Sequence, residues 1–176
     1  MNATEVHRTF LDALGLAVIA HGDVQQKPLN VDLALPLPPR LRVYAYSLVS
    51  AAGTRRQREY KASLRISGQV VNTYASFDHS EGRFAIVIAY RQDLNVFVLW
   101  DASLHPRFKN GGNIQVKDTT VLNAVATGYE LQLRTLATGV TEVVIACIAK
   151  NLPRAISERI YYTGGITEGE WERWRN

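Results

Sequence analysis

The apolar positions of this chain follow two spacings, one helical and one extended. Over residues 4–20 apolar side chains recur at helical intervals, with Thr4 as the expected N-cap and Gly22 as the expected end. Residues 23–39 contain four prolines and predict an extended connection without a helix. Further helices are predicted over residues 118–127 and 152–162.

Most other apolar residues alternate with polar ones or form short β-branched runs, which is typical of strands. The strands that these patterns predict cover residues 40–49, 59–67, 84–90, 96–100, 113–117 and 141–149, whereas 129–136 fits a strand or a helix. The strands follow one another as hairpins and do not alternate with helices. An α+β fold is therefore predicted, with a mainly antiparallel, curved or barrel-like sheet and peripheral helices.

The segment 101–112 follows the apolar strand 96–100 and is rich in turn-forming and basic residues. Pro106 lacks an N–H and cannot continue a central strand, and Gly111 permits a backbone path that is closed to other residues. A basic loop on a rigid strand is a favourable place for a binding site, although an ordinary surface loop is an equally open interpretation. The long loop 68–83 is a second candidate.

Composition indicates a globular protein with a basic face. The chain has 176 residues, 47% of them hydrophobic and 20% charged, and a net charge of +4. We expect one domain over residues 1–165 and a C-terminal linker over 166–176. Between residues 40 and 65 a single acid stands among seven basic residues, which favours contact with phosphates over a merely solvated face: Arg40, Arg42, Arg55, Arg56, Arg58, Lys61 and Arg65.

Localisation follows from what the sequence lacks. Cys147 is the only cysteine, so a disulfide within the chain is impossible, and we expect it to be a buried, inert thiol. The sequence shows no signal peptide and no apolar stretch long enough for a membrane span. A soluble, cytoplasmic protein without a membrane partner is expected.

One short and common pattern in the sequence is typical of a class of catalytic sites. The four histidines lack metal-site spacing and no nucleotide-binding loop is present, so we expect no metal and no cofactor. Ser76 and Asp78 with His79 or His105 could imitate a catalytic triad, but surface histidines are more frequent. Glu59 and Lys61 form an ExK pattern of metal-dependent nucleases, which would need Asp78 or Asp101 as a further acid. An exposed, salt-bridging strand face explains the same pattern.

Three segments resemble the DNA sulfur-binding domain, which accompanies HNH nuclease domains in McrA-type restriction enzymes that attack phosphorothioate-modified DNA. The segments are REYKASLRI at 58–66, HSEGRFAIVIAYRQDLNVFVLWDASLHPRFKNGGNIQVK at 79–117 and EVVIACIA at 142–149. The resemblance covers about residues 40–162. It implies a reader of double-stranded phosphorothioate DNA in a bacterial restriction system.

The resemblance also implies the site residues. An apolar cavity for the sulfur is implied around His105 and Pro106, with Arg107 and Lys109 in its wall, although the family often has a small residue where Lys109 stands. The implied phosphate contacts are Arg58, with Arg55 and Arg56 as neighbours, and Lys61 and Lys109. The candidates for reading neighbouring bases are Tyr74, Ser76, Asp78, His79 and Asn110.

The cutting domain of such enzymes is missing from these residues. An HNH site needs histidines and usually structural cysteines, and after His105 the chain has no histidine and only Cys147. We therefore expect a reader without catalytic residues, fused to an HNH nuclease domain in a longer protein. Three alternatives stay open: the ExK nuclease, a reader that flips a methylated base into a cavity of Tyr74, Phe77 and Trp100, and a protein–protein module.

Overall fold

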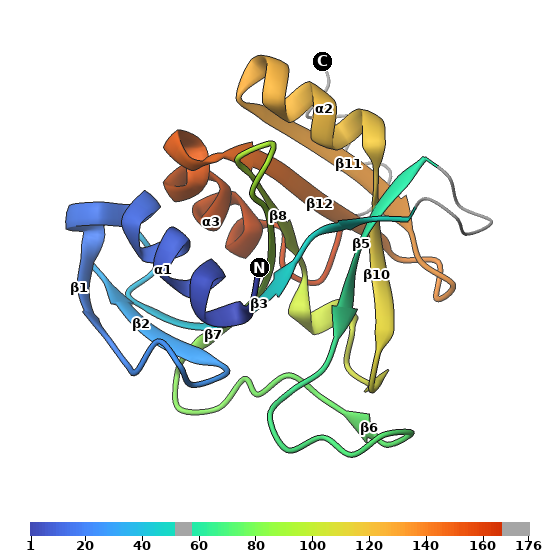
Figure 1. Cartoon of the computed structure of the whole chain (residues 1–176), viewed down its shortest axis with the longest axis horizontal. Coiled ribbons are helices and arrows are strands. Elements are labelled where there is room, and N and C mark those ends of the chain that lie inside the picture. The colour runs from blue at the N-terminus through green and yellow to red at the C-terminus, as the bar shows by residue number, and fades with distance from the viewer. Residues whose placement is uncertain (52–57, 167–176) are drawn as a thin grey trace.

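The computed structural model describes residues 1–51 and 58–166, whose centre is a seven-stranded sheet (Figure 1). Its strands, in spatial order, are β1 (Val18–His21), β2 (Leu29–Leu33), β3 (Arg40–Ser47), β7 (Phe84–Arg91), β8 (Val96–Trp100), β12 (Thr141–Ile148) and β11 (Tyr129–Thr135). Neighbouring strands are antiparallel except β3 and β7, which are parallel. Among the described strands β1 and β11 are the edges, so the sheet does not close into a barrel.

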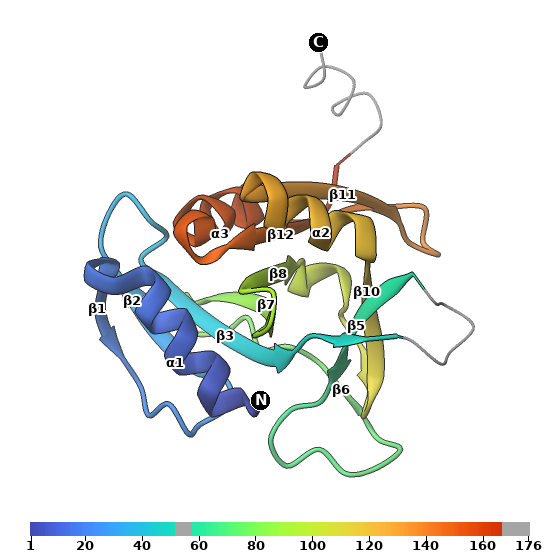
Figure 2. The ribbon, with the colours of Figure 1, turned by 45° about the horizontal axis from the view of Figure 1, so that its top comes forward.

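Two smaller sheets complete the β structure of the described residues. One has the order β10 (Gly112–Lys117), β5 (Glu59–Leu64), β4 (Val49–Ser50), and the other joins β6 (Tyr74–Ala75) to β9 (Phe108–Lys109). In Figure 2 β5 and β10 stand side by side, with α2 (Asp118–Thr127) at one end and β6 toward the other. Within residues 1–51 and 58–166 three short 3-10 helices form, at Gly15–Ala17, Ala102–Leu104 and Ala149–Asn151.

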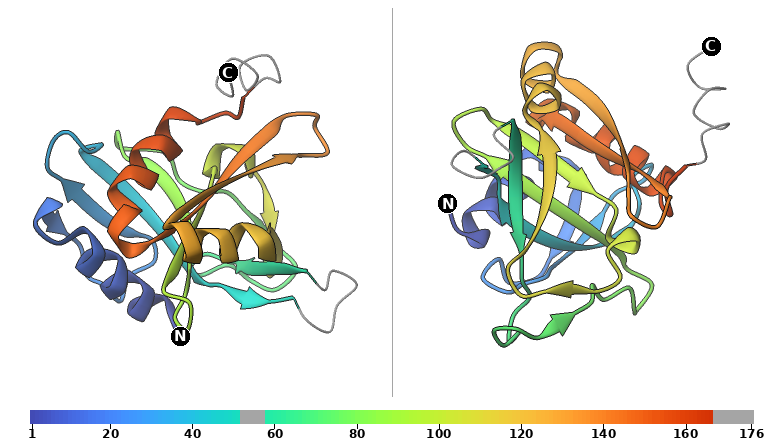
Figure 3. Two further views of the ribbon diagram at one scale, coloured as in Figure 1. Left: turned by 90° about the horizontal axis from the view of Figure 1, so that it is seen from above. Right: turned by 90° about the vertical axis from the view of Figure 1, so that its right-hand side faces the viewer.

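The central sheet is buried on both faces, and its strands send alternate side chains into two cores. On β8, Phe97 and Leu99 enter the first core, whereas Val98 and Trp100 enter the second. Helices α1 (Ala3–Leu14) and α3 (Leu152–Tyr161) cover the first core, and β5, β10 and α2 cover the second (Figure 3). This double burial explains why the apolar runs are continuous.

The predicted fold class is confirmed, as are most of the predicted strands. The ambiguous segment 129–136 is strand β11, which pairs with β12 along its whole length. The helices predicted over 118–127 and 152–162 are α2 and α3. No helix in the described ranges is both long and apolar enough to cross a membrane.

The N-terminal prediction was wrong in its boundaries. Helix α1 is capped by Asn2, not Thr4, and ends before Gly15, whose φ of 50° lies in the left-handed region, not at Gly22. Leu16 and Ile19, counted as part of the apolar helix face, are exposed, and β1 begins at Val18. Inside the predicted connection 23–39 lies β2, an alternating strand whose flanking prolines obscured its pattern.

Candidate nucleic-acid-binding site

The sheet of β6 and β9 joins the two loops in which the sequence located candidate site residues. Tyr74 pairs with Lys109, and Ala75 pairs with Phe108. Residues 74–79 and 105–110 therefore lie side by side, and we call their exposed residues the β6–β9 surface. Pro106, Arg107 and Lys109 are exposed on it, as are Tyr74, Ser76, Asp78 and His79.

Two phenylalanines anchor this surface in the second core. The ring of Phe77 lies 4.6 Å from that of Phe108 and 4.7 Å from that of Tyr44, measured between centroids. Both phenylalanines are buried. Such aromatic packing fixes the loops on the central sheet, so the exposed residues between them have defined positions.

Side-chain amides order loop 65–73 and hold loop 105–110 to it. Gln69 Nε2 donates to the Thr73 carbonyl at 3.1 Å, and the Asn110 side chain donates to the Gln69 carbonyl at 2.9 Å. The Asn110 backbone N–H also donates to the Thr73 carbonyl. The side-chain nitrogen of Asn110, predicted to read bases, is thus used within the protein.

Arg107 and Tyr74 form a stacked pair on the outer side of the surface. The guanidinium carbon of Arg107 lies 4.0 Å from the centre of the Tyr74 ring, in cation–π contact. Tyr74 remains 56% exposed. A planar cation beside an exposed aromatic ring offers both charge and stacking area, and nucleic-acid-binding surfaces use this combination.

His105 faces inward, toward a buried group of charges. Its Nε2 lies 2.9 Å from Oε1 of Glu142, a fully buried carboxylate that also accepts the Asp101 backbone N–H at 3.0 Å. Asp101 in turn pairs with buried Arg159 at 3.3 Å. His105 therefore connects the loop to the core. Pro106 is the exposed apolar residue of this loop.

The serine–aspartate–histidine arrangement is not assembled around His105. His105 contacts Glu142, whereas Asp78 forms an ion pair with Arg42 and accepts the Ser80 N–H at 2.8 Å. Hydrogen bonds from Ser80 lower the pKa of the Asp78 carboxyl. Its neighbour His79 is exposed.

Arg58 lies at the far end of β5 from Pro106. Strands β5 and β10 are antiparallel, with Glu59 opposite Lys117 and Leu64 opposite Gly112. Six residues of strand, at about 3.3 Å each, separate Arg58 from the loop by about 20 Å. Arg58 is thus distant from the Gly112 end of β10, and its role as a phosphate contact stays a prediction. Arg55 and Arg56 lie outside the described residues, and Lys61 stands midway, opposite Gln115.

Neither of the two acids proposed to complete the ExK pattern is available to it. Glu59 and Lys61 lie two apart on β5, but Asp101 is buried against Arg159 and Asp78 is paired with Arg42. Within the described ranges no three His, Cys, Asp or Glu residues are grouped as a metal site would require.

The aromatic cavity expected for a flipped base is also absent from the described residues. Trp100 and Phe77 are 0% and 4% exposed and belong to the second core. The Trp100 indole donates to the Gln115 carbonyl at 3.2 Å. Of the three predicted aromatic residues only Tyr74 is exposed, so these residues do not form a pocket for a flipped methylated base.

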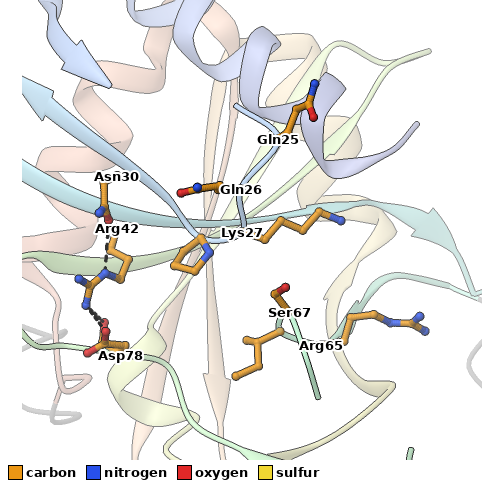
Figure 4. Close-up of a pocket in the computed structure, with 10 residues that line it drawn as sticks. Gln25, Gln26, Lys27, Asn30, Arg42, Arg65, Ser67 and Asp78 are labelled. Carbon is orange, nitrogen blue, oxygen red and sulfur yellow. Dashed lines mark hydrogen bonds and ion pairs between the residues drawn. The ribbon is translucent and has the colours of Figure 1, made fainter. Parts of the chain in front are cut away.

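An open groove of about 790 Å³ adjoins the β6–β9 surface (Figure 4). Its lining comes from the segment after β1, from β2 and β3, and from the loops after β5 and β6: Gln25, Gln26, Lys27, Pro28, Asn30, Arg42, Arg65, Ile66, Ser67 and Asp78. In Figure 4 Arg42 is joined to Asn30 and Asp78 on one side, and Lys27 and Arg65 extend toward the other. Sequence reasoning missed Lys27, because it lies in a segment interpreted as a plain connection.

Comparison with known proteins identifies one family. A family model described as methylase-associated X1 matches residues 39–156, which include the whole β6–β9 surface. No curated protein and no solved structure matches the chain.

Proposed function

The chain belongs to the methylase-associated X1 family, and on that premise we propose that its β6–β9 surface binds double-stranded DNA and recognises a phosphorothioate linkage. The observation that carries the proposal is the pairing of β6 with β9. It gathers Pro106, Arg107, Lys109 and Tyr74 on one exposed surface. Such a surface has cations for the charged DNA backbone and an apolar contact for the sulfur atom, which is less strongly hydrated than oxygen.

The chemical basis is a difference in desolvation. A phosphorothioate keeps the charge of a phosphate, but its sulfur is larger, more polarisable and less strongly hydrated than oxygen. Contact with the exposed Pro106 ring costs little for sulfur, whereas oxygen loses hydrogen bonds to water. Arg107 attracts both linkages equally, so the preference comes from the apolar contact.

The residue roles follow the geometry. Arg107, next to Pro106, and Lys109, opposite Tyr74, contact the modified linkage, while Arg58 and Lys61 on the side of β5 contact other phosphates of the duplex. His105 positions the loop through Glu142. Recognition is the role of this chain, and an HNH nuclease domain elsewhere in a longer protein performs cleavage.

Matched duplexes that differ by one Rp sulfur test the proposal by fluorescence anisotropy across a salt series. The wild type is expected to prefer sulfur by tenfold or more, which corresponds to about 1.4 kcal/mol. Pro106→Ala should reduce that preference, and Arg107→Gln should weaken binding of both duplexes. Pro39→Ala, which changes an exposed proline far along the chain, is the matched control.

Two outcomes would contradict the proposal. Equal wild-type affinity for the two duplexes would exclude sulfur recognition. Affinity that does not fall with rising salt would exclude contact with phosphates.

A further inference from the structure

The groove beside the β6–β9 surface has two basic side chains in a shared wall. Lys27 and Arg65 line the groove of about 790 Å³ and also a neighbouring depression of about 340 Å³. Both side chains are exposed, although they come from segments far apart in the sequence. They stand at the boundary of two hollows, where a ligand in either one would meet them.

The charges of this groove are unbalanced. Its lining contains three basic side chains and one acid, Asp78. Arg42 is already bound to Asp78 and Glu81. Lys27 and Arg65 form no ion pair with any residue in 1–51 or 58–166. These two cations leave the charge of the groove positive, and a bound anion can balance it.

The remaining lining indicates which anion fits. Amide and hydroxyl groups from Gln25, Gln26, Asn30 and Ser67 offer hydrogen bonds to phosphate and sugar oxygens. None of the lining residues is aromatic, so the groove offers no stacking surface for a base. Its chemistry matches a sugar–phosphate backbone and not an extruded base.

The groove is continuous with the β6–β9 surface. Arg65, Ile66 and Ser67, which line the groove, begin the loop in which Gln69 donates to the Thr73 carbonyl just before β6. Asp78 lines the groove and is also part of the β6–β9 surface. The two sites therefore adjoin at Asp78.

We propose that the Lys27–Arg65 groove binds the sugar–phosphate backbone of a nucleic-acid strand, as a second site beside the β6–β9 surface. That this strand is the same modified DNA rests on the proposed function. The preference of the groove for phosphate is independent of the proposed function, because it follows from the residues that line the groove.

The first measurement is the salt dependence of binding to an unmodified duplex. Lys27→Gln and Arg65→Gln should each weaken binding and reduce the slope of log K against log salt by about 0.9, the value for one phosphate contact. Lys150→Gln removes one exposed charge next to α3 and should leave the slope unchanged. The ratio of sulfur to oxygen affinity should stay at the wild-type value in both groove variants.

The second measurement uses a short single-stranded thymidine oligonucleotide and its neutral methylphosphonate analogue. The phosphate form should bind and the neutral form should not, and Lys27→Gln and Arg65→Gln should weaken the phosphate form. If Lys27→Gln and Arg65→Gln bind the duplex and the oligonucleotide as Lys150→Gln does, the groove does not bind phosphate. The proposal of sulfur recognition would be unaffected by that result. If the groove variants bind more weakly and the wild type shows no preference for sulfur, the groove proposal is supported and sulfur recognition is refuted.

Discussion

Asp101 links the candidate surface to the interior through several bonds. Its Oδ1 accepts the Ser103 N–H at 2.9 Å, and its Oδ2 accepts the Gly164 N–H at 2.7 Å and pairs with Arg159. The sequence marked Asp101 as the end of a strand and as a possible nuclease acid. The structure gives it a partner 58 residues away, which no local pattern could have indicated.

Asp101→Ala is expected to lower the free energy of unfolding by about 3–5 kcal/mol, because it removes the carboxylate that pairs with the buried Arg159 guanidinium. Urea denaturation measures the loss. Asp93→Ala breaks an exposed ion pair with Arg91 and is the control, for which a much smaller loss is expected. Equal losses in the two variants would contradict the importance of the buried pair.

Cys147 is one residue whose state the sequence did predict. It is buried in β12, and burial raises the pKa of its thiol to about 12. The thiol therefore stays protonated at neutral pH, which agrees with the expectation of an inert cysteine. The apolar run around Cys147 was enough for this prediction, because both faces of such a strand are covered.

At the scale of elements, β6 and β9 show where sequence patterns stop. Each strand is two residues long, too short for any periodicity, and the sequence presented them as parts of two separate loops. Gln69 strengthens their contact, since its Nε2 also lies 3.5 Å from the Phe108 carbonyl and its Oε1 accepts the Ile66 N–H at 3.2 Å. One side chain thus connects the loop after β5 to β9 and to Thr73, the residue before β6.

Gln69→Ala is expected to weaken DNA binding by roughly tenfold, because the loops lose hydrogen bonds with a net value of about 1–1.5 kcal/mol. Amide hydrogen exchange should accelerate in residues 66–73 and 108–110, while the central sheet keeps its protection. Gln92→Ala, in the exposed turn between β7 and β8, is the matched control. Unchanged exchange in both loops would contradict this role.

For the whole molecule, the two-sided core sets the minimum chain that can fold. The first core requires Val6 and Phe10 from α1 and Leu29 and Val31 from β2. All four lie outside residues 39–156, the range that the family model matches. The family match therefore covers the candidate surface but not the layer that supports it from behind.

A chain limited to residues 39–156 is expected to lack a stable fold, because one face of β3, β7 and β8 loses its cover. Urea titration should show no cooperative transition, and the fluorescence of a dye that binds exposed apolar surface should rise. The full chain is the reference. A cooperative transition in the shortened chain, with a midpoint near that of the full chain, would contradict this expectation.

By itself the sequence determined the strands that are buried on both faces, such as β7, β8 and β12, and with them the α+β class. Continuous β-branched runs of this length have few other stable arrangements. It overextended α1, because apolar spacing alone does not show that Leu16 and Ile19 are exposed. Only the tertiary structure decided that β6 pairs with β9, that His105 contacts Glu142 and that Lys27 and Arg65 line one groove. These contacts join residues far apart in the chain, and such pairings leave no local periodicity from which to predict them.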